Sequence, residues 1–97
     1  LFNLAIQANP YSSMSYVGIG NCFSKQNDNV RAIDNYTRAA SIDPNNKFAY
    51  NGLGAIYSRH DHKQATINFD KAIQLDPNFA YPYNGLGTMF YEQKKYS

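Results

Sequence analysis

The sequence predicts an all-α fold in which antiparallel pairs of helices stack in a row. A unit of about 34 residues recurs along the chain, and Pro10, Pro44 and Pro77 mark the same position in successive units. Within each unit the apolar residues keep the spacing of one helical face, and no segment alternates apolar and polar residues as a half-buried strand would. Units of this length cannot bury their apolar faces alone, so each must pack against the next.

The first full unit contains two predicted helices joined by a turn at Asp28. The first helix carries four repeated residues at positions i, i+3, i+4 and i+7 of one face: Tyr16, Ile19, Gly20 and Phe23. The second helix has an apolar stripe from Ala32 to Ala40 and ends at Asp43-Pro44, because a residue that precedes proline avoids the helical conformation. The second unit predicts helices over 50–59 and 63–75, with one residue fewer in the turn between them.

Eight positions recur with the same pattern in the two complete units. They are Tyr16, Ile19, Gly20, Phe23, Ala32, Tyr36, Ala39 and Pro44 in one, and Tyr50, Leu53, Gly54, Tyr57, Ala65, Phe69, Ala72 and Pro77 in the next. This pattern resembles the tetratricopeptide repeat (TPR) family. The resemblance implies a right-handed α-solenoid with a concave groove, lined by the first helix of each pair. It divides the chain into the second half of a repeat (1–12), two full repeats (13–46 and 47–79) and the first half of another (80–97).

Both ends of the chain interrupt a repeat. Residues 1–9 match the tail of a second helix, with Phe2 and Ala5 equivalent to Tyr36 and Ala39. We therefore interpret the sequence as a fragment of a longer array without polar capping helices. Exposed apolar ends of a solenoid favour association, so we expect self-association or domain swapping at high concentration.

The resemblance also implies which residues face a ligand. By repeat position, the residues that we expect to contact a partner in the groove are Asn21, Lys25, Phe48, Asn51, Arg59, Tyr81, Asn84 and Tyr91. Their aromatic rings suit apolar side chains and their amides can bond a peptide backbone, which favours a peptide or a helix of another protein as ligand. Asn51 and Asn84 occupy the same repeat position and predict a short amide ladder. The alternative is that asparagine is simply common in this chain.

Glycine recurs in pairs inside the first helices. Gly18, Gly52 and Gly85 each precede the packing glycine of their unit by two residues. Glycine inside a helix costs about 1 kcal/mol relative to alanine, so these positions need a compensating gain. A bare backbone admits either a ligand in the groove or a neighbouring helix, and we favour close helix packing. A nucleotide-binding loop is excluded, because no strand precedes the glycines and no third glycine follows.

Composition excludes several functions. Nine basic against seven acidic residues give a net charge of +2, too small for a nucleic-acid surface. No apolar run reaches the roughly 18 residues of a membrane span, and a single cysteine favours a reducing, intracellular compartment, either cytoplasm or nucleus. We expect Cys22 to be a small buried hydrophobe. His60 and His62 flank one aspartate in a turn, too few ligands for a metal, and neither a catalytic constellation nor a cofactor motif is present.

The resemblance raises two subclasses and one alternative. A carboxylate clamp for acidic chaperone tails needs cations at positions that here hold uncharged residues, Val17, Phe48 and Gly52 among them, so we exclude it. Segments 20–24 and 76–81 look similar to TPR scaffold subunits of the anaphase-promoting complex (cyclosome), which would imply a place in a multiprotein assembly. We therefore expect a non-enzymatic interaction scaffold. The alternative is the substrate-recognition segment of a larger enzyme, such as a glycosyltransferase or a phosphatase.

Overall fold

The computed structural model describes residues 12–96, which form helices and no strand, as expected for the all-α fold. In chain order the helices are α2 (Ser13–Lys25), α3 (Asn29–Ile42), α4 (Lys47–Tyr57), α5 (His62–Leu75) and α6 (Ala80–Tyr96). The proposed second-helix tail with Phe2 and Ala5 lies outside the described residues. We call α2, α4 and α6 the first helices and α3 and α5 the second helices.

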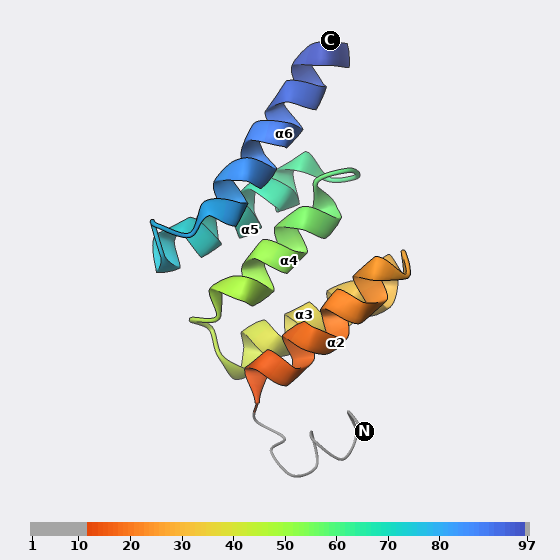
Figure 1. Cartoon of the computed structure of the whole chain (residues 1–97), viewed down its shortest axis with the longest axis vertical. Helices are drawn as coiled ribbons and strands as arrows, with labels where there is room; N and C mark the ends of the chain where they lie inside the picture. Colours follow the sequence, from red (N-terminus) through yellow and green to blue (C-terminus); the bar gives the residue numbers. More distant parts are fainter. Residues whose placement is uncertain (1–11, 97) are drawn as a thin grey trace.

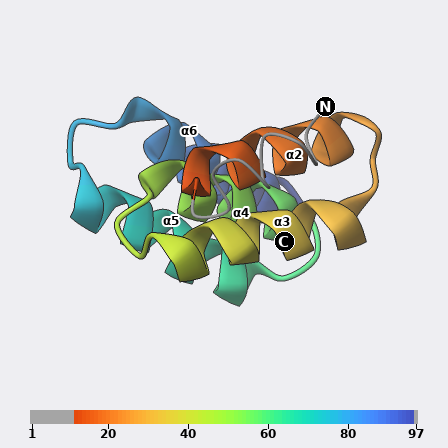
Figure 2. The same ribbon diagram turned by 90° about the horizontal axis from the view of Figure 1, so that it is seen from below.

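The helices stack as antiparallel pairs along the long axis of the molecule (Figure 1). Helix α2 pairs with α3 and α4 pairs with α5, while α3 also contacts α4 and α5 also contacts α6. The first helices touch in succession, α2 against α4 and α4 against α6. Seen from below, α2 and α6 lie on one side of the molecule and α3 and α5 on the other (Figure 2). The first helices therefore share one surface of the solenoid.

Polar side chains start the helices where the sequence indicates. The carboxylate of Asp28 accepts a hydrogen bond from the backbone N–H of Arg31 at the start of α3, and Asp61 accepts one from Gln64 at the start of α5. After α2, the chain turns at Asn27, whose φ of 61° lies in the left-handed region that asparagine tolerates. These turns are short, so consecutive helices run antiparallel.

Small buried residues let the helices approach closely. The second helices each place two alanines with no exposed surface around one buried ring: Ala32 and Ala39 flank Tyr36 in α3, and Ala65 and Ala72 flank Phe69 in α5. The two rings belong to two separate buried clusters, one in each repeat. The core therefore consists of one aromatic centre per helix pair, repeated along the stack.

A buried polar bridge ties three helices together at the first junction. The side-chain amide of Asn46, the N-cap of α4, donates to the Ser13 hydroxyl over 2.7 Å, and Ser13 donates to the backbone carbonyl of Ala39 over 2.7 Å. The amide oxygen of Asn46 also accepts from the backbone N–H of Phe48. Since every group has a partner, the bridge fixes α2, α3 and α4 relative to one another. Sequence reasoning did not single out Asn46.

Candidate functional site

The two buried rings pack directly against glycines of the first helices, and we call each such glycine position a seat. The ring of Tyr36 lies between Gly20 of α2 and Gly52 of α4, and a Cβ at Gly52 would meet its Cε1 at 2.6 Å. Residues two apart on a helix are about 200° apart around its axis, so Gly52 and Gly54 face opposite sides of α4. Each first helix can therefore receive one ring on each side. The preferred explanation of these pairs, close helix packing, is confirmed at Gly52.

The ring of Phe69 repeats the arrangement one unit later. It lies between Gly54 of α4 and Gly85 of α6, and a Cβ at Gly54 would meet its Cδ1 at 2.6 Å. Real Cβ contacts are essentially never that short. The helix penalty of these glycines is therefore offset by ring burial. The remaining two glycines differ: a Cβ at Gly18 or Gly87 would meet nothing within 4 Å.

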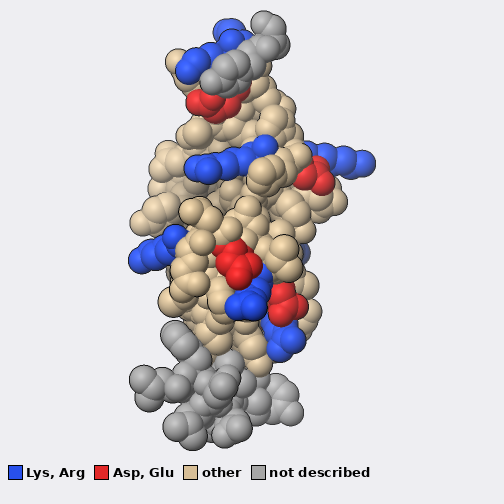
Figure 3. Space-filling view, turned by 90° about the vertical axis from the view of Figure 1, so that its right-hand side faces the viewer, with Lys and Arg blue, Asp and Glu red and all other residues tan. Residues whose placement is uncertain are grey.

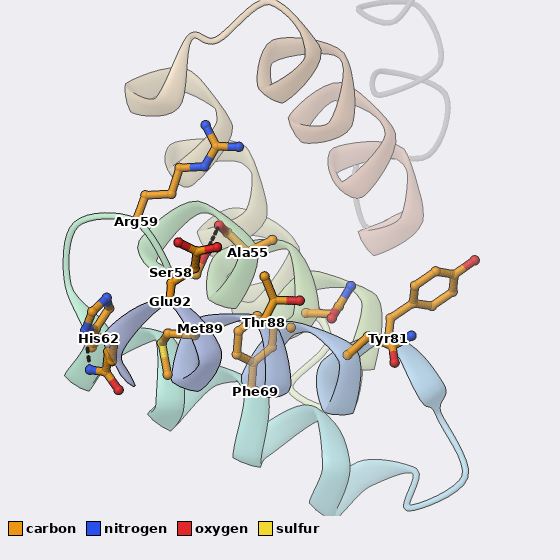
Figure 4. A pocket seen from close by; sticks show the side chains of 13 residues that line it. Ala55, Ser58, Arg59, His62, Phe69, Tyr81, Thr88, Met89 and Glu92 are labelled. Atoms are coloured by element: carbon orange, nitrogen blue, oxygen red, sulfur yellow. Dashed lines mark hydrogen bonds between the residues drawn. The ribbon is translucent and has the colours of Figure 1, made fainter. Parts of the chain in front are cut away.

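A pocket of about 820 Å³ opens on the surface of the first helices, between α4 and α6. Phe69 and Met89, both buried, contribute its apolar interior, and Figure 4 shows His62 and Tyr81 at opposite ends with Phe69, Met89 and Thr88 between them. The residues that line it are Asn51, Ala55, Ser58, Arg59, His62, Phe69, Tyr81, Asn84, Gly85, Thr88, Met89, Glu92 and Gln93. Its size is that of a small-ligand or peptide site.

The identity of the buried ring explains why the pocket is apolar inside. In the first repeat, the hydroxyl of Tyr36 donates to the side-chain oxygen of Asn21, which closes off that ring with an amide. Burial, and to a lesser extent the nearby Cys22, raises the pKa of Tyr36, so the hydroxyl stays protonated and remains a donor at neutral pH. In the second repeat the equivalents are Phe69 and Ala55, which have no polar group to pair. The second ring is therefore left as an apolar wall.

The pocket is nearly neutral in charge. Arg59 and Glu92 bring one charge of each sign, and within residues 12–96 neither forms an ion pair. At the His62 end, the ring nitrogen Nδ1 of His62 meets the side-chain nitrogen of Gln93, which joins α5 to α6. The face seen in Figure 3 shows Lys and Arg interspersed with Asp and Glu over a mostly uncharged surface. A strongly charged ligand would find no matching field here.

Four of the residues expected to contact a partner meet in this pocket: Asn51, Arg59, Tyr81 and Asn84. The amides of Asn51 and Asn84 have no hydrogen-bond partner among the described residues, so both are available to a ligand. They come from the same position of α4 and α6, on one side of the pocket that these helices enclose. Tyr81 is 67% exposed and offers an uncovered ring.

The other four expected residues lie elsewhere. Asn21 holds the Tyr36 hydroxyl, and Lys25 and Tyr91 are exposed side chains that do not line the pocket. Phe48 stands edge-on to Phe79, with ring centroids 5.3 Å apart. Phe48 lines a second hollow, of about 380 Å³, at the junction of the two repeats.

An ion pair with aromatic cover sits beside that hollow. The ammonium of Lys47 pairs with the carboxylate of Asp76 and lies 4.9 Å from the ring centroid of Phe79. The hydrogen bond from Lys47, together with one from the backbone N–H of Asn78, holds the pKa of Asp76 below its usual range. These contacts staple the start of α4 to the end of α5. They leave both charges already paired and so unsuited to recruiting a charged ligand.

The sequence prediction that Cys22 is buried is wrong. Cys22 is exposed, because it lies one helical turn after Gly18, on the face of α2 where a Cβ would meet nothing. Two residues at positions that a carboxylate clamp would use, Val17 and Gly52, are buried: Val17 belongs to the first core cluster and Gly52 receives the Tyr36 ring. Both residues therefore pack between helices and do not face a ligand.

The residues that sequence reasoning missed are the pocket's interior and one of its ends. Phe69 and Met89 occupy repeat packing positions, which predict core and give no sign that these side chains form the floor of a pocket. His62 and Gln93 come from different helices, and no spacing rule predicts their contact. In residues 12–96 no group of three or more His, Cys, Asp or Glu is placed to hold a metal ion. Among the same residues, no helix combines the length and the apolarity that crossing a membrane requires.

With this geometry in place, comparison with known proteins is informative. Residues 15–46 match the family model of the tetratricopeptide repeat. Helices α2 and α3 thus match one tetratricopeptide repeat. The TPR protein YrrB, whose structure is described as having an unusual peptide-binding site, superimposes with a TM-score of 0.86 at 27% identity, over 97% of this chain and 49% of YrrB. The expected family and its helical stacking are therefore confirmed.

Two further proteins extend the comparison. The first TPR of Spaghetti (RPAP3), solved with the HSP90 peptide SRMEEVD, superimposes with a TM-score of 0.85 at 18% identity, over 99% of this chain and 75% of that one. Anaphase-promoting complex subunit 3 of Schizosaccharomyces pombe is 34% identical over 56 residues. That match covers 58% of this chain and 8% of the subunit, so the chain spans a small part of this relative's length. The expected similarity to such a subunit is confirmed over this stretch.

Proposed function

We propose that this TPR segment is a protein-interaction module whose pocket between α4 and α6 binds a weakly charged, extended peptide of a partner protein. The observation that carries the proposal is the combination of one apolar interior with two unpaired amides above it. An apolar side chain of the peptide seats against Phe69 and Met89, while Asn51 and Asn84 bond its backbone. Peptide binding by two TPR neighbours, YrrB and the first TPR of Spaghetti, supports this use of the fold.

The chemistry of the lining sets the expected preference. The peptide of the Spaghetti complex, SRMEEVD, is acidic at its end, whereas this pocket holds one positive and one negative side chain, Arg59 and Glu92. An unpaired carboxylate in the pocket would lose hydration without gaining a cation for each charge. We therefore place Arg59 at the rim, on the His62 side of the pocket (Figure 4), as a contact for one polar group of the ligand. Neutral peptides with an aliphatic or aromatic residue are the favoured class.

The experiment begins with a peptide selected from a display library on the purified chain, followed by isothermal titration. We expect the double variant Asn51→Ala/Asn84→Ala to weaken its affinity about thirtyfold, because two hydrogen bonds of about 1 kcal/mol each are lost. The matched control is Asn68→Ala on α5, whose amide bonds the Gln64 carbonyl away from the pocket. If the double variant binds as tightly as Asn68→Ala, the amide ladder plays no part in recognition.

Self-association remains a second expectation for this chain. Tyr83 and Phe90 of α6 are large apolar side chains with about half of their surface exposed, at 48% and 53%. Apolar surface of this kind favours association when protein is concentrated. We expect static light scattering to give a mass that rises with concentration, and a monomer mass up to millimolar protein would contradict the expectation.

The similarity to an anaphase-promoting complex subunit supports a place in a multiprotein assembly. We propose that residues 12–96 act there as a scaffold and not as an enzyme. A TPR segment can equally select substrates for an enzyme domain elsewhere in a longer chain. Affinity purification of the full-length parent protein from its native cell, followed by mass spectrometry, distinguishes these settings: companion subunits support a scaffold, and a single polypeptide with an enzyme domain supports the alternative. The exposed thiol of Cys22 supports an intracellular, reducing setting.

A further inference from the structure

Three aromatic rings form a row that leads from the pocket to the junction of the two repeats. Tyr81, at one end of the pocket, stands edge-on to Phe79, with ring centroids 5.5 Å apart. Phe79 in turn stands edge-on to Phe48 over 5.3 Å. We call Phe48, Phe79 and Tyr81 the aromatic row. Phe79 is buried, whereas Phe48 is 43% and Tyr81 67% exposed, so the row presents two open rings on either side of a closed one.

The row is a fixed part of the surface that the first helices share. Phe48 stays exposed although its helix, α4, contacts both α2 and α6 in the stack. The ammonium of Lys47, paired with Asp76, lies 5.3 Å from the ring centroid of Phe48 and 4.9 Å from that of Phe79. Rings that are held in this way lose little conformational freedom when a ligand covers them, which favours binding.

Each open ring has an amide one helical turn away. Asn51 follows Phe48 by three residues in α4, and Asn84 follows Tyr81 by three residues in α6, so ring and amide are neighbours on the surface of each helix. Both amides line the pocket and have no hydrogen-bond partner among residues 12–96. The two helices therefore carry the same unit, one ring and one amide, next to each other.

The spacing of these two units selects the conformation of a ligand. The centroids of Phe48 and Tyr81 can be no farther apart than the two steps of 5.3 and 5.5 Å through Phe79 allow, and packed helices typically lie about 8–10 Å apart. A polyproline II helix returns a side chain to the same face every three residues, after about 9 Å. A β-strand does so every two residues, after about 7 Å and then about 13 Å. The polyproline II repeat is therefore the one that places a side chain on both rings.

The polar chemistry of the surface fits the same conformation. The backbone carbonyls of a polyproline II segment make no internal hydrogen bonds, and its prolines have no N–H that needs an acceptor. The side-chain NH₂ groups of Asn51 and Asn84 can each donate to one such carbonyl. The pocket holds one side chain of each charge, Arg59 and Glu92, and so provides no net field that would favour a charged segment.

We propose that this surface binds a neutral, proline-rich segment of a partner protein in the polyproline II conformation, with two prolines three residues apart against Phe48 and Tyr81. The pyrrolidine rings pack on the aromatic rings, and carbonyls beside them accept hydrogen bonds from Asn51 and Asn84. Such a segment is stiff before it binds, so it loses little entropy on binding. The inference rests on the proposed function, because it names the class of peptide that the pocket and the aromatic row bind together.

The test titrates the whole chain into a fluorescent peptide made of three copies of Pro-Ala-Leu, at concentrations where light scattering shows a monomer. We expect saturable binding in fluorescence anisotropy. A peptide with alanine in place of every proline, and one with the same residues reordered so that prolines stand at every second position, should each bind more than about tenfold more weakly. No binding of the first peptide up to about millimolar concentration, or equal binding of all three, overturns the proposal.

Variants of α6 locate the bound peptide. Tyr81→Ala should weaken binding of the first peptide about tenfold, whereas Tyr81→Phe should leave it within about twofold, because the ring and not the hydroxyl makes the contact. The matched control is Tyr91→Ala, which removes a ring that is 64% exposed on the same helix but does not line the pocket. Equal binding to the Tyr81→Ala and Tyr91→Ala variants shows that the peptide lies elsewhere and overturns the proposal.

The peptide selected from the display library distinguishes failure of the proline preference from failure of the proposed function. If the selected peptide binds and loses affinity with Asn51→Ala/Asn84→Ala, while the Pro-Ala-Leu peptide does not bind, the pocket takes peptides of another class. In that case only the proline preference is overturned. If neither peptide binds, the proposed function is overturned with it.

Discussion

Replacing Phe69 with alanine is expected to lower the free energy of unfolding by about 3–5 kcal/mol. Phe69 is 1% exposed and fills the seats of Gly54 and Gly85, so its removal leaves a cavity between three helices that two glycines cannot fill. A loss of this size is comparable with the whole stability of a small domain. Urea unfolding followed by circular dichroism at 222 nm measures it, and a transition shifted toward zero denaturant is the expected result.

The control is Phe90→Ala, which removes the same ring from an exposed position of α6. This variant should change the unfolding free energy by less than about 1 kcal/mol. Similar losses for the two variants would mean that ring burial between glycines contributes little, and that general hydrophobicity of the helices stabilises the stack.

Gly54→Leu is expected to lower the unfolding free energy by about 3 kcal/mol or more. Even the first added carbon would stand 2.6 Å from Phe69, and the ring is held on its other side by Gly85. The matched change Gly87→Leu should instead raise the unfolding free energy by about 1 kcal/mol, because leucine is the better helix former and the site is open. Thermal unfolding of the two variants under one set of conditions gives the comparison.

The two leucine variants are expected to change the unfolding free energy in opposite directions. Both substitutions put the same side chain at the same repeat position, so differences in helix propensity cancel. If Gly54→Leu proves as stable as Gly87→Leu, the Phe69 ring moves aside without penalty, and the glycines are not required as seats.

The repeat spacing was enough to predict the all-α fold and the pairing of helices, because each packing position appears at least twice. Local residue preferences alone explain why Asp28 and Asp61 cap the starts of α3 and α5. They also explain why these helices end just before Asp43-Pro44 and Asp76-Pro77. For the paired glycines, the sequence left two explanations open, a ligand in the groove or a neighbouring helix. The structure decides between them for Gly52 and Gly54, which face opposite sides of α4 and receive the rings of Tyr36 and Phe69.

The pocket was predictable only in part. Position within the repeat correctly predicted that Asn51 and Asn84 share one surface. It also predicted that Asn21 contacts a ligand, whereas in the structure Asn21 accepts a hydrogen bond from the Tyr36 hydroxyl. That difference depends on whether the second helix carries tyrosine or phenylalanine, a contact between residues far apart in the chain. The exposure of Cys22 likewise depends on what covers its face of α2, which spacing within one helix does not specify.

A double-mutant cycle between Gly54→Ala and Phe69→Ala tests the central claim most directly: that glycine is kept in these helices because a ring occupies its place. Stabilities of the four proteins are compared in the same concentration of trimethylamine N-oxide, which keeps the weakest one folded. We predict that Gly54→Ala destabilises the chain when Phe69 is present and stabilises it by about 1 kcal/mol when Phe69 is alanine. Equal effects of Gly54→Ala in the two backgrounds would contradict the account.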